Sequence, residues 1–103
     1  MTSRTEALYA NLRQMIAVLE AERQALATLD ADELVEVSRK KQSLCDELEP
    51  VGADELDELT RELVTTASAL NEVNRRVRNL LAANVAARLE VLGGSRAAYS
   101  AVG

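Results

Sequence analysis

The residues of this chain with the types and spacing for acid–base or metal chemistry are its acidic pairs and its single cysteine. The pairs Glu20/Glu22 and Asp57/Glu58 can be considered as a general acid and base, but no nucleophile or pocket-forming loop accompanies them. The chain has no histidine, which excludes a Ser/His or Cys/His pair and a Cys/His zinc cage. Cys45 falls on an apolar helix face, which predicts a small buried side chain rather than a redox sensor. We predict no enzymatic activity and no cofactor or metal.

A second candidate is the basic cluster Arg75-Arg76-Val77-Arg78, because Lys and Arg neutralise phosphates in nucleic-acid complexes. The net charge of −5, the absence of Phe and Trp and the lack of a binding motif favour a solvated helix face instead. Residues 30–72 hold 13 acids and four bases, whereas residues 73–103 hold five bases and one acid. We therefore expect no nucleic-acid partner, and the basic end has an acidic complement within the same chain.

The third candidate is an apolar surface in the C-terminal third. One helical seam passes through Val77 and Leu80, and a second stripe lies beside it and widens the apolar arc beyond a single seam. Such a face suits an amphipathic partner helix anchored at i, i+3, i+4 and i+7. It also suits an intramolecular core or a homodimer seam. The second stripe consists of Leu81, Val85, Leu89 and Leu92.

The composition predicts that helices position all of these residues. Sixteen Leu, seventeen Ala and ten Val supply most of the hydrophobic content, which is typical of coiled coils. Four Gly and one Pro are too few for the turns of several short strands. At 103 residues, the chain has the length of a single domain. We predict one all-α domain over residues 1–103.

Capping and stop signals divide the chain into three helices. Ser3 and Glu6 form a capping box, which predicts a first helix over about 4–29. Asp30 is the expected N-cap of a second helix over about 31–49, which Pro50 ends. The third helix is predicted over about 54–92, from an acidic first turn to a stop at Gly93-Gly94. Residues 93–103 are expected to form a mobile tail or a frayed extra turn.

Apolar residues recur at three- and four-residue steps in each predicted helix, which indicates three antiparallel helices packed as a coiled coil or bundle. The long third helix cannot be covered along its whole length by the two shorter ones, so its second half is expected to lack an intramolecular partner. The first seam is Leu8, Leu12, Met15, Leu19, Glu22, Leu26 and Leu29; the second is Leu34, Val37, Lys41, Leu44 and Leu48; the third is Leu56, Leu59, Leu63, Thr66, Leu70, Val73, Val77, Leu80, Asn84, Ala87 and Val91.

The order of several short motifs is distinctive. A Leu-rich first helix is followed by Arg39-Lys40-Lys41-Gln42-Ser43-Leu44, then by Asn71-Glu72-Val73-Asn74 ahead of Leu80-Leu81, and finally by Tyr99-Ser100-Ala101-Val102-Gly103. In this order and spacing, across nearly the whole chain, the sequence resembles the FlgN family of flagellar export chaperones.

The resemblance implies a chaperone that binds the C-terminal helices of hook-associated proteins, which form the hook–filament junction. It would prevent their premature assembly and deliver them to the flagellar export gate. By the same resemblance, Tyr99 is the candidate contact to the gate. Arg75, Arg78 and Arg88 would steer the substrate electrostatically. The substrate helix would contact Val77, Leu80, Leu81, Val85, Leu89 and Leu92.

A structural coiled-coil homo-oligomer or scaffold is the alternative, in which residues 77–92 pair permanently with a second copy. A homodimer of the free protein is a further alternative. No uncharged apolar run approaches the roughly 18 residues of a membrane span, and no signal-peptide pattern is visible. A lone cysteine suits a reducing compartment. We expect a cytoplasmic protein without membrane insertion.

Overall fold

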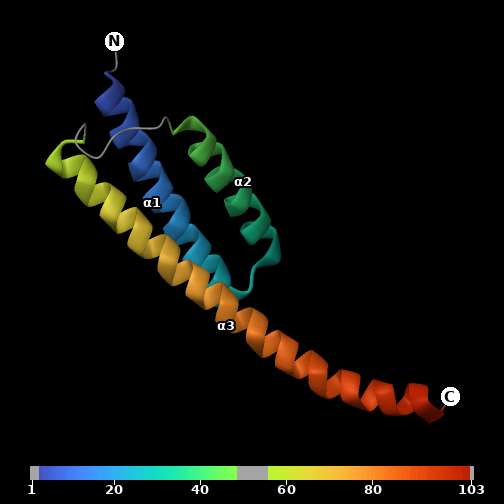
Figure 1. Ribbon diagram of the computed structural model, residues 1–103. Coiled ribbons are helices and arrows are strands. Elements are labelled where there is room, and N and C mark those ends of the chain that lie inside the picture. The colour runs from blue at the N-terminus through green and yellow to red at the C-terminus, as the bar shows by residue number, and fades with distance from the viewer. Residues whose placement is uncertain (1–2, 49–55, 103) are drawn as a thin grey trace.

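The computed structural model describes the backbone of residues 3–48 and 56–102 and the side chains of residues 3–48 and 56–93. These ranges contain three helices, α1 (Arg4–Thr28), α2 (Ala31–Glu47) and α3 (Glu58–Val102), and no strand. Successive helices run antiparallel, and α1 packs against both α2 and α3, which barely contact each other (Figure 1). The predicted all-α architecture of three helices with one long C-terminal helix is confirmed.

The core forms on the predicted seam of α1. Leu12, Met15, Leu19 and Leu26 are all buried, because the three- and four-residue steps keep them on one side of the helix. From α2, Leu44 joins Met15 and Leu19 in the main apolar cluster, to which α3 contributes a small residue, Ala67. The side chains packed around this cluster are Ile16, Val18 and Leu70.

The face that α3 turns toward the core differs from the predicted seam. Its most buried residues are Thr60, Ala67 and Asn74, which are spaced by seven residues. Leu59 and Leu80, which the seam placed inside, are exposed. Small and polar side chains occupy the line of closest approach, and larger apolar residues such as Leu63 and Leu70 flank it while half-buried. The apolar pattern therefore predicted the correct side of α3 to within about one residue.

A left-handed residue joins α1 to α2. Leu29, predicted as the last seam position of the first helix, has φ 54° and ψ 41° and is exposed. The helix ends in a Schellman motif in which the Leu29 amide donates to the Leu26 carbonyl and the Asp30 amide donates to the Ala25 carbonyl. Because Asp30 Oδ1 then accepts from the Glu33 amide at 3.0 Å, the second helix starts at once, as predicted.

Helix α2 ends earlier than predicted, and helix α3 begins later than predicted. At the end of α2, the Leu48 amide donates to the Cys45 carbonyl. The predicted end at residue 49 and the predicted stop at Pro50 both lie outside the described residues. The acidic cluster at Asp54 is also outside them. Helix α3 begins at Glu58 because Asp57 is its N-cap, with Asp57 Oδ1 accepting from the Thr60 amide at 2.7 Å.

The predicted stop at Gly93-Gly94 is wrong. Helix α3 continues through both glycines to Val102, so residues 93–102 are helical rather than a separate tail. A glycine ends a helix when it adopts the left-handed conformation, and no described glycine has a positive φ. Each helical glycine costs only about 1 kcal/mol relative to alanine. Arg96, Ala97 and Ala98 follow, and these residue types favour a helix.

The molecule is elongated, with extents of 70 × 24 × 22 Å and a radius of gyration of 19.5 Å. A compact domain of this length has a radius of gyration of about 13 Å. Figure 1 shows the reason: α3 extends far beyond the turn between α1 and α2. The three helices therefore form a bundle at one end and a single unsupported helix at the other.

Candidate partner-binding surface

The most conspicuous surface is the part of α3 that leaves the bundle, residues 80–102, which we call the projecting segment (Figure 1). Every described residue from Ala82 to Gly93 is exposed. An isolated helix is marginally stable in water without burial of an apolar face. The described large apolar side chains beyond Leu81 thus lack the cover that the first half of α3 receives from α1.

The six predicted contact residues divide into two groups. Val77 and Leu81 are half-buried, where α3 leaves the bundle. The other four are exposed: Leu80 (71%), Val85 (55%), Leu89 (60%) and Leu92 (61%). Leu81, Val85, Leu89 and Leu92 have the four- and three-residue spacing that aligns side chains along one side of a helix. The structure thus brings the predicted stripe together and leaves most of it open.

One exposed residue was absent from that prediction. Val91 is 73% exposed, more than any other large apolar residue among the described side chains of the projecting segment. Val91 belongs to the seam predicted for the third helix, and this position was the signal from which it could have been added to the candidate residues. The apolar arc of the segment is accordingly wider than the predicted stripe.

The three predicted steering arginines have different surroundings. Arg75 donates to both carboxylate oxygens of Glu72, at 2.6 and 2.9 Å, and this contact lowers the pKa of Glu72 to about 2 and raises the pKa of Arg75. Arg78 Nη1 lies 3.8 Å from Glu22 Oε2. Arg88 has no ion-pair partner among the described residues, so it is the most available of the three for a partner.

A polar cluster lies where the projecting segment leaves the bundle. The Asn74 amide nitrogen donates to Glu22 Oε1 and to the Leu19 carbonyl, both at 2.8 Å, and both side chains of the Asn74–Glu22 pair are buried. Lys41 Nζ lies 3.5 Å from Glu22 Oε1. One carboxylate of α1 therefore links α2 and α3. A charged residue in the apolar seam of the first helix and a lysine in that of the second were the available signals.

An apolar groove of ≈360 Å³ lies between α2 and α3, with α1 as its floor. It exists because α2 and α3 flank α1 without closing on each other. Cys45, predicted to be buried, is exposed and lines this groove, because Leu44 rather than Cys45 points into the core. The lining residues are Leu8, Leu12, Met15, Leu19, Lys41, Cys45, Leu48, Leu56, Val64, Ala67, Ser68 and Asn71.

The remaining points concern Tyr99, metal binding and membrane crossing. Tyr99 lies in the last turns of α3, and its side chain is outside the described part. Within the described residues, no group of three or more acidic or Cys side chains is arranged to hold a metal ion. No described helix combines the length and apolar character that crossing a membrane requires.

Comparisons with known proteins add no relative. No protein-family model matches the chain, and neither a curated protein nor a solved structure is significantly similar to it. The proposed function therefore rests on the side chains themselves. They form an open apolar stripe on a long helix, next to Arg88, which has no ion-pair partner among the described residues, and a bundle that polar contacts of Glu22 hold together.

Proposed function

We propose that the protein is a cytoplasmic flagellar export chaperone of the FlgN type, which binds the C-terminal helices of hook-associated proteins on its projecting segment. The observation that carries the proposal is the exposure of Leu80, Val85, Leu89 and Leu92 on one unsupported helix. The motif order of the sequence supports the choice of substrate, and delivery to the export gate through Tyr99 belongs to the same proposal.

Apolar burial supplies the binding free energy in this proposal. Each exposed Leu or Val on the stripe contributes roughly 25 cal/mol per Å² of apolar surface that a partner helix covers. A partner with apolar residues at i, i+3, i+4 and i+7 matches the spacing of the stripe. Covering the stripe also protects the partner's own apolar face, which is what a chaperone of a self-associating helix must do.

Electrostatics set the approach and orientation of the partner. Arg88 lies between Val85 and Leu89 in the sequence and has no ion-pair partner among the described residues. A free cation at the edge of an apolar surface raises the association rate for an acidic partner more than it raises affinity. Arg75 and Arg78 already have carboxylate neighbours, so Arg88 carries most of this steering.

Titration calorimetry of the full chain against synthetic C-terminal helices of hook-associated proteins tests the proposal. We expect saturable binding at one helix per chain. Leu89→Asp should abolish the binding heat, because it places a charge in the middle of the stripe. Ala83→Asp is the matched control: Ala83 is exposed on the opposite side of the same helix from the stripe, and this variant should bind as the unmodified chain does.

The alternative, a structural coiled-coil homo-oligomer, predicts a different outcome. Its apolar stripe would be permanently paired, so no hook-associated helix would bind at any concentration. Light scattering would then give the same oligomer at every dilution. This pair of results would replace the export-chaperone proposal with the scaffold.

A further inference from the structure

The isolated chain exposes more surface than its mass accounts for. Its accessible surface is 7654 Å². A folded monomer of 11.2 kDa exposes roughly 5,700 Å² by the scaling of surface with mass. The excess, about 2,000 Å² per chain, would give about 4,000 Å² in a symmetric pair, which is within the range of stable homodimers. The excess accessible surface is therefore large enough for the interface with a second copy of the chain.

The groove and the projecting segment are complementary in shape and apolar character. The groove is lined mainly by apolar side chains and is open along one side of the bundle, and the projecting segment is a helix with an apolar stripe. A helix laid in this groove would contact α1, α2 and α3 and convert the three-helix bundle into a four-helix arrangement. Within one chain this is impossible, because the projecting segment continues α3 away from the bundle (Figure 1).

The length of α3 suits a two-fold pair. Leu80 divides the 45 residues of α3 into 22 residues on each side, each about 33 Å long. Two antiparallel copies of α3 that cross at Leu80 would set each projecting segment alongside the bundled half of the partner. A two-fold contact of this kind is isologous, so both copies use the same two surfaces.

The stripe and the groove also lie on the same side of α3. Val85 follows Ala67 by 18 residues, and Leu89 follows Asn71 by 18 residues, and 18 residues make five full helical turns. Ala67 and Asn71 belong to the groove wall. A second α3 on that side would therefore cover the groove wall of one copy and the stripe of the other at once.

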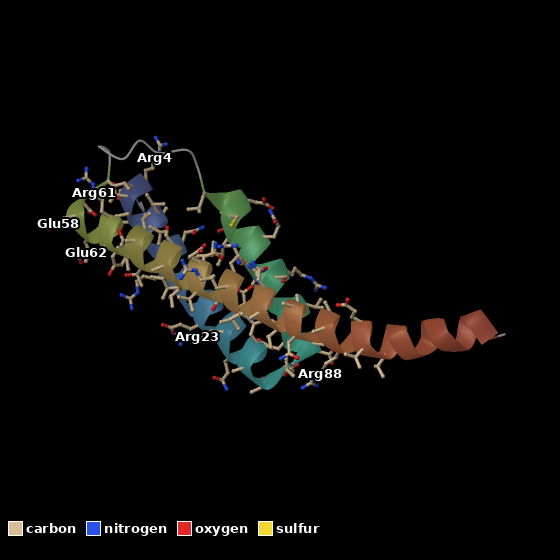
Figure 2. All side chains as sticks on the ribbon, turned by 60° about the horizontal axis from the view of Figure 1, so that its bottom comes forward. Arg4, Arg23, Glu58, Arg61, Glu62 and Arg88 are labelled. Atoms are coloured by element: carbon tan, nitrogen blue, oxygen red, sulfur yellow. The ribbon has the colours of Figure 1, made fainter. Side chains whose placement is uncertain are left out.

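Charge favours the same pairing. The projecting segment carries Arg88 and Arg96 against Glu90 alone, whereas the acids of residues 30–72 outnumber the bases of that range by nine. Glu58 and Glu62 lie at the end of the bundle remote from the projecting segment (Figure 2). In the antiparallel pair, the part of the projecting segment that holds the two arginines extends toward the end of the partner that carries Glu58 and Glu62.

From these observations we propose that the free protein is a two-fold dimer in which the projecting segment of each copy occupies the α2–α3 groove of the other. The proposal does not depend on the identity of any export substrate. It predicts that the apolar stripe and the groove are both covered in the concentrated protein and both become exposed on dilution.

Cys45, the single cysteine of the chain, reports directly on the groove. The unmodified chain should sediment as a dimer at high micromolar concentration and as a monomer on dilution. The rate at which Cys45 reacts with a thiol reagent should fall several-fold over the same increase in concentration, because the partner's helix covers it. Two independent variants should remove both effects: Leu89→Asp on the stripe and Ser68→Arg on the exposed groove wall. Ala83→Asp, on the opposite side of the helix from the stripe, should behave as the unmodified chain.

Before these measurements, circular dichroism of each variant checks that it is folded. A chain that sediments as a monomer at all concentrations overturns the proposal. So does a dimer whose Cys45 reacts at the same rate at every concentration, because its stripes would then be paired with each other outside the groove. Dimerisation of both Leu89→Asp and Ser68→Arg would contradict the proposal as well.

Discussion

Asn74 shows how one buried amide fixes the geometry at the base of the projecting segment. Its nitrogen donates to the Glu22 carboxylate and to the Leu19 carbonyl across the α1–α3 contact. The carboxylate in turn faces Lys41 of α2 and Arg78 of α3. A buried carboxylate needs hydrogen bonds and cations of this kind to offset its lost hydration. Asn74 is therefore a structural residue of the motif that it shares with Asn71.

Asn74→Ala should lower the free energy of unfolding by about 2–3 kcal/mol, because it removes the donor of two buried hydrogen bonds, one to the Glu22 carboxylate and one to the Leu19 carbonyl. Urea unfolding followed by circular dichroism measures the change. Asn71→Ala is the matched control in the same motif. Asn71 is exposed, so its replacement should change the free energy by no more than about 0.5 kcal/mol. Equal effects of the two variants would show that the Asn74 contacts contribute nothing specific.

Sequence reasoning identified the participants of this cluster without their connection. Glu22 and Lys41 were recognised as charged residues in apolar seams, and a seam position predicts that a side chain points inward. The partner of each depends on how α2 and α3 rotate about α1, which periodicity does not determine. The same rotation exposed Cys45 and buried Asn74.

At the scale of elements, the turn between α1 and α2 carries the clearest local strain. Leu29 has a positive φ, a conformation that costs an L-residue with a Cβ about 1–2 kcal/mol. Its side chain is exposed, so little burial offsets this cost. Two capping hydrogen bonds and the immediate start of α2 at the Asp30 N-cap hold the residue there.

Leu29→Gly should stabilise the protein by about 0.5–1 kcal/mol, since glycine adopts this conformation without steric cost and the gain exceeds the added entropy of the unfolded chain. The midpoint of urea unfolding should rise. Leu29→Ala keeps the Cβ and should give no stabilisation, which separates backbone strain from loss of the leucine side chain. A lower midpoint for Leu29→Gly would mean that the leucine side chain contributes more than the strain costs.

Helix starts could be predicted more accurately than helix ends. Ser3 and Asp30 cap α1 and α2 through the side-chain contacts expected of them, since these bonds depend only on residues three apart. The end of α3 was wrong because Gly93-Gly94 permits a stop without requiring one. The start of α3 was wrong because several acids in a row offer alternative N-caps, and Asp57 is the one used.

At the scale of the molecule, the two halves of α3 differ in what holds them. The first half packs on α1, whereas every described side chain from Ala82 to Gly93 is exposed on a helix that extends beyond the bundle. The free energy of local opening is therefore expected to fall steeply along α3. The candidate surface could be predicted because it depends on the pattern of a single helix. The groove could not, since it depends on how three helices pack.

Gly93→Ala separates these two parts of the molecule. A Cβ at residue 93 would meet nothing within 4 Å, so alanine fits and should favour the local helix by about 1 kcal/mol. Hydrogen exchange of amides near residue 93 should slow, while the free energy of unfolding of the bundle stays within about 0.5 kcal/mol of its starting value. Both are measured in a Leu89→Asp background, which removes association between copies. Ala67→Gly, in the core, should instead lower the free energy of bundle unfolding by at least about 1 kcal/mol. If Gly93→Ala raised the stability of the bundle by as much as Ala67→Gly lowers it, the projecting segment would unfold together with the bundle, and its stripe would not be an independent surface.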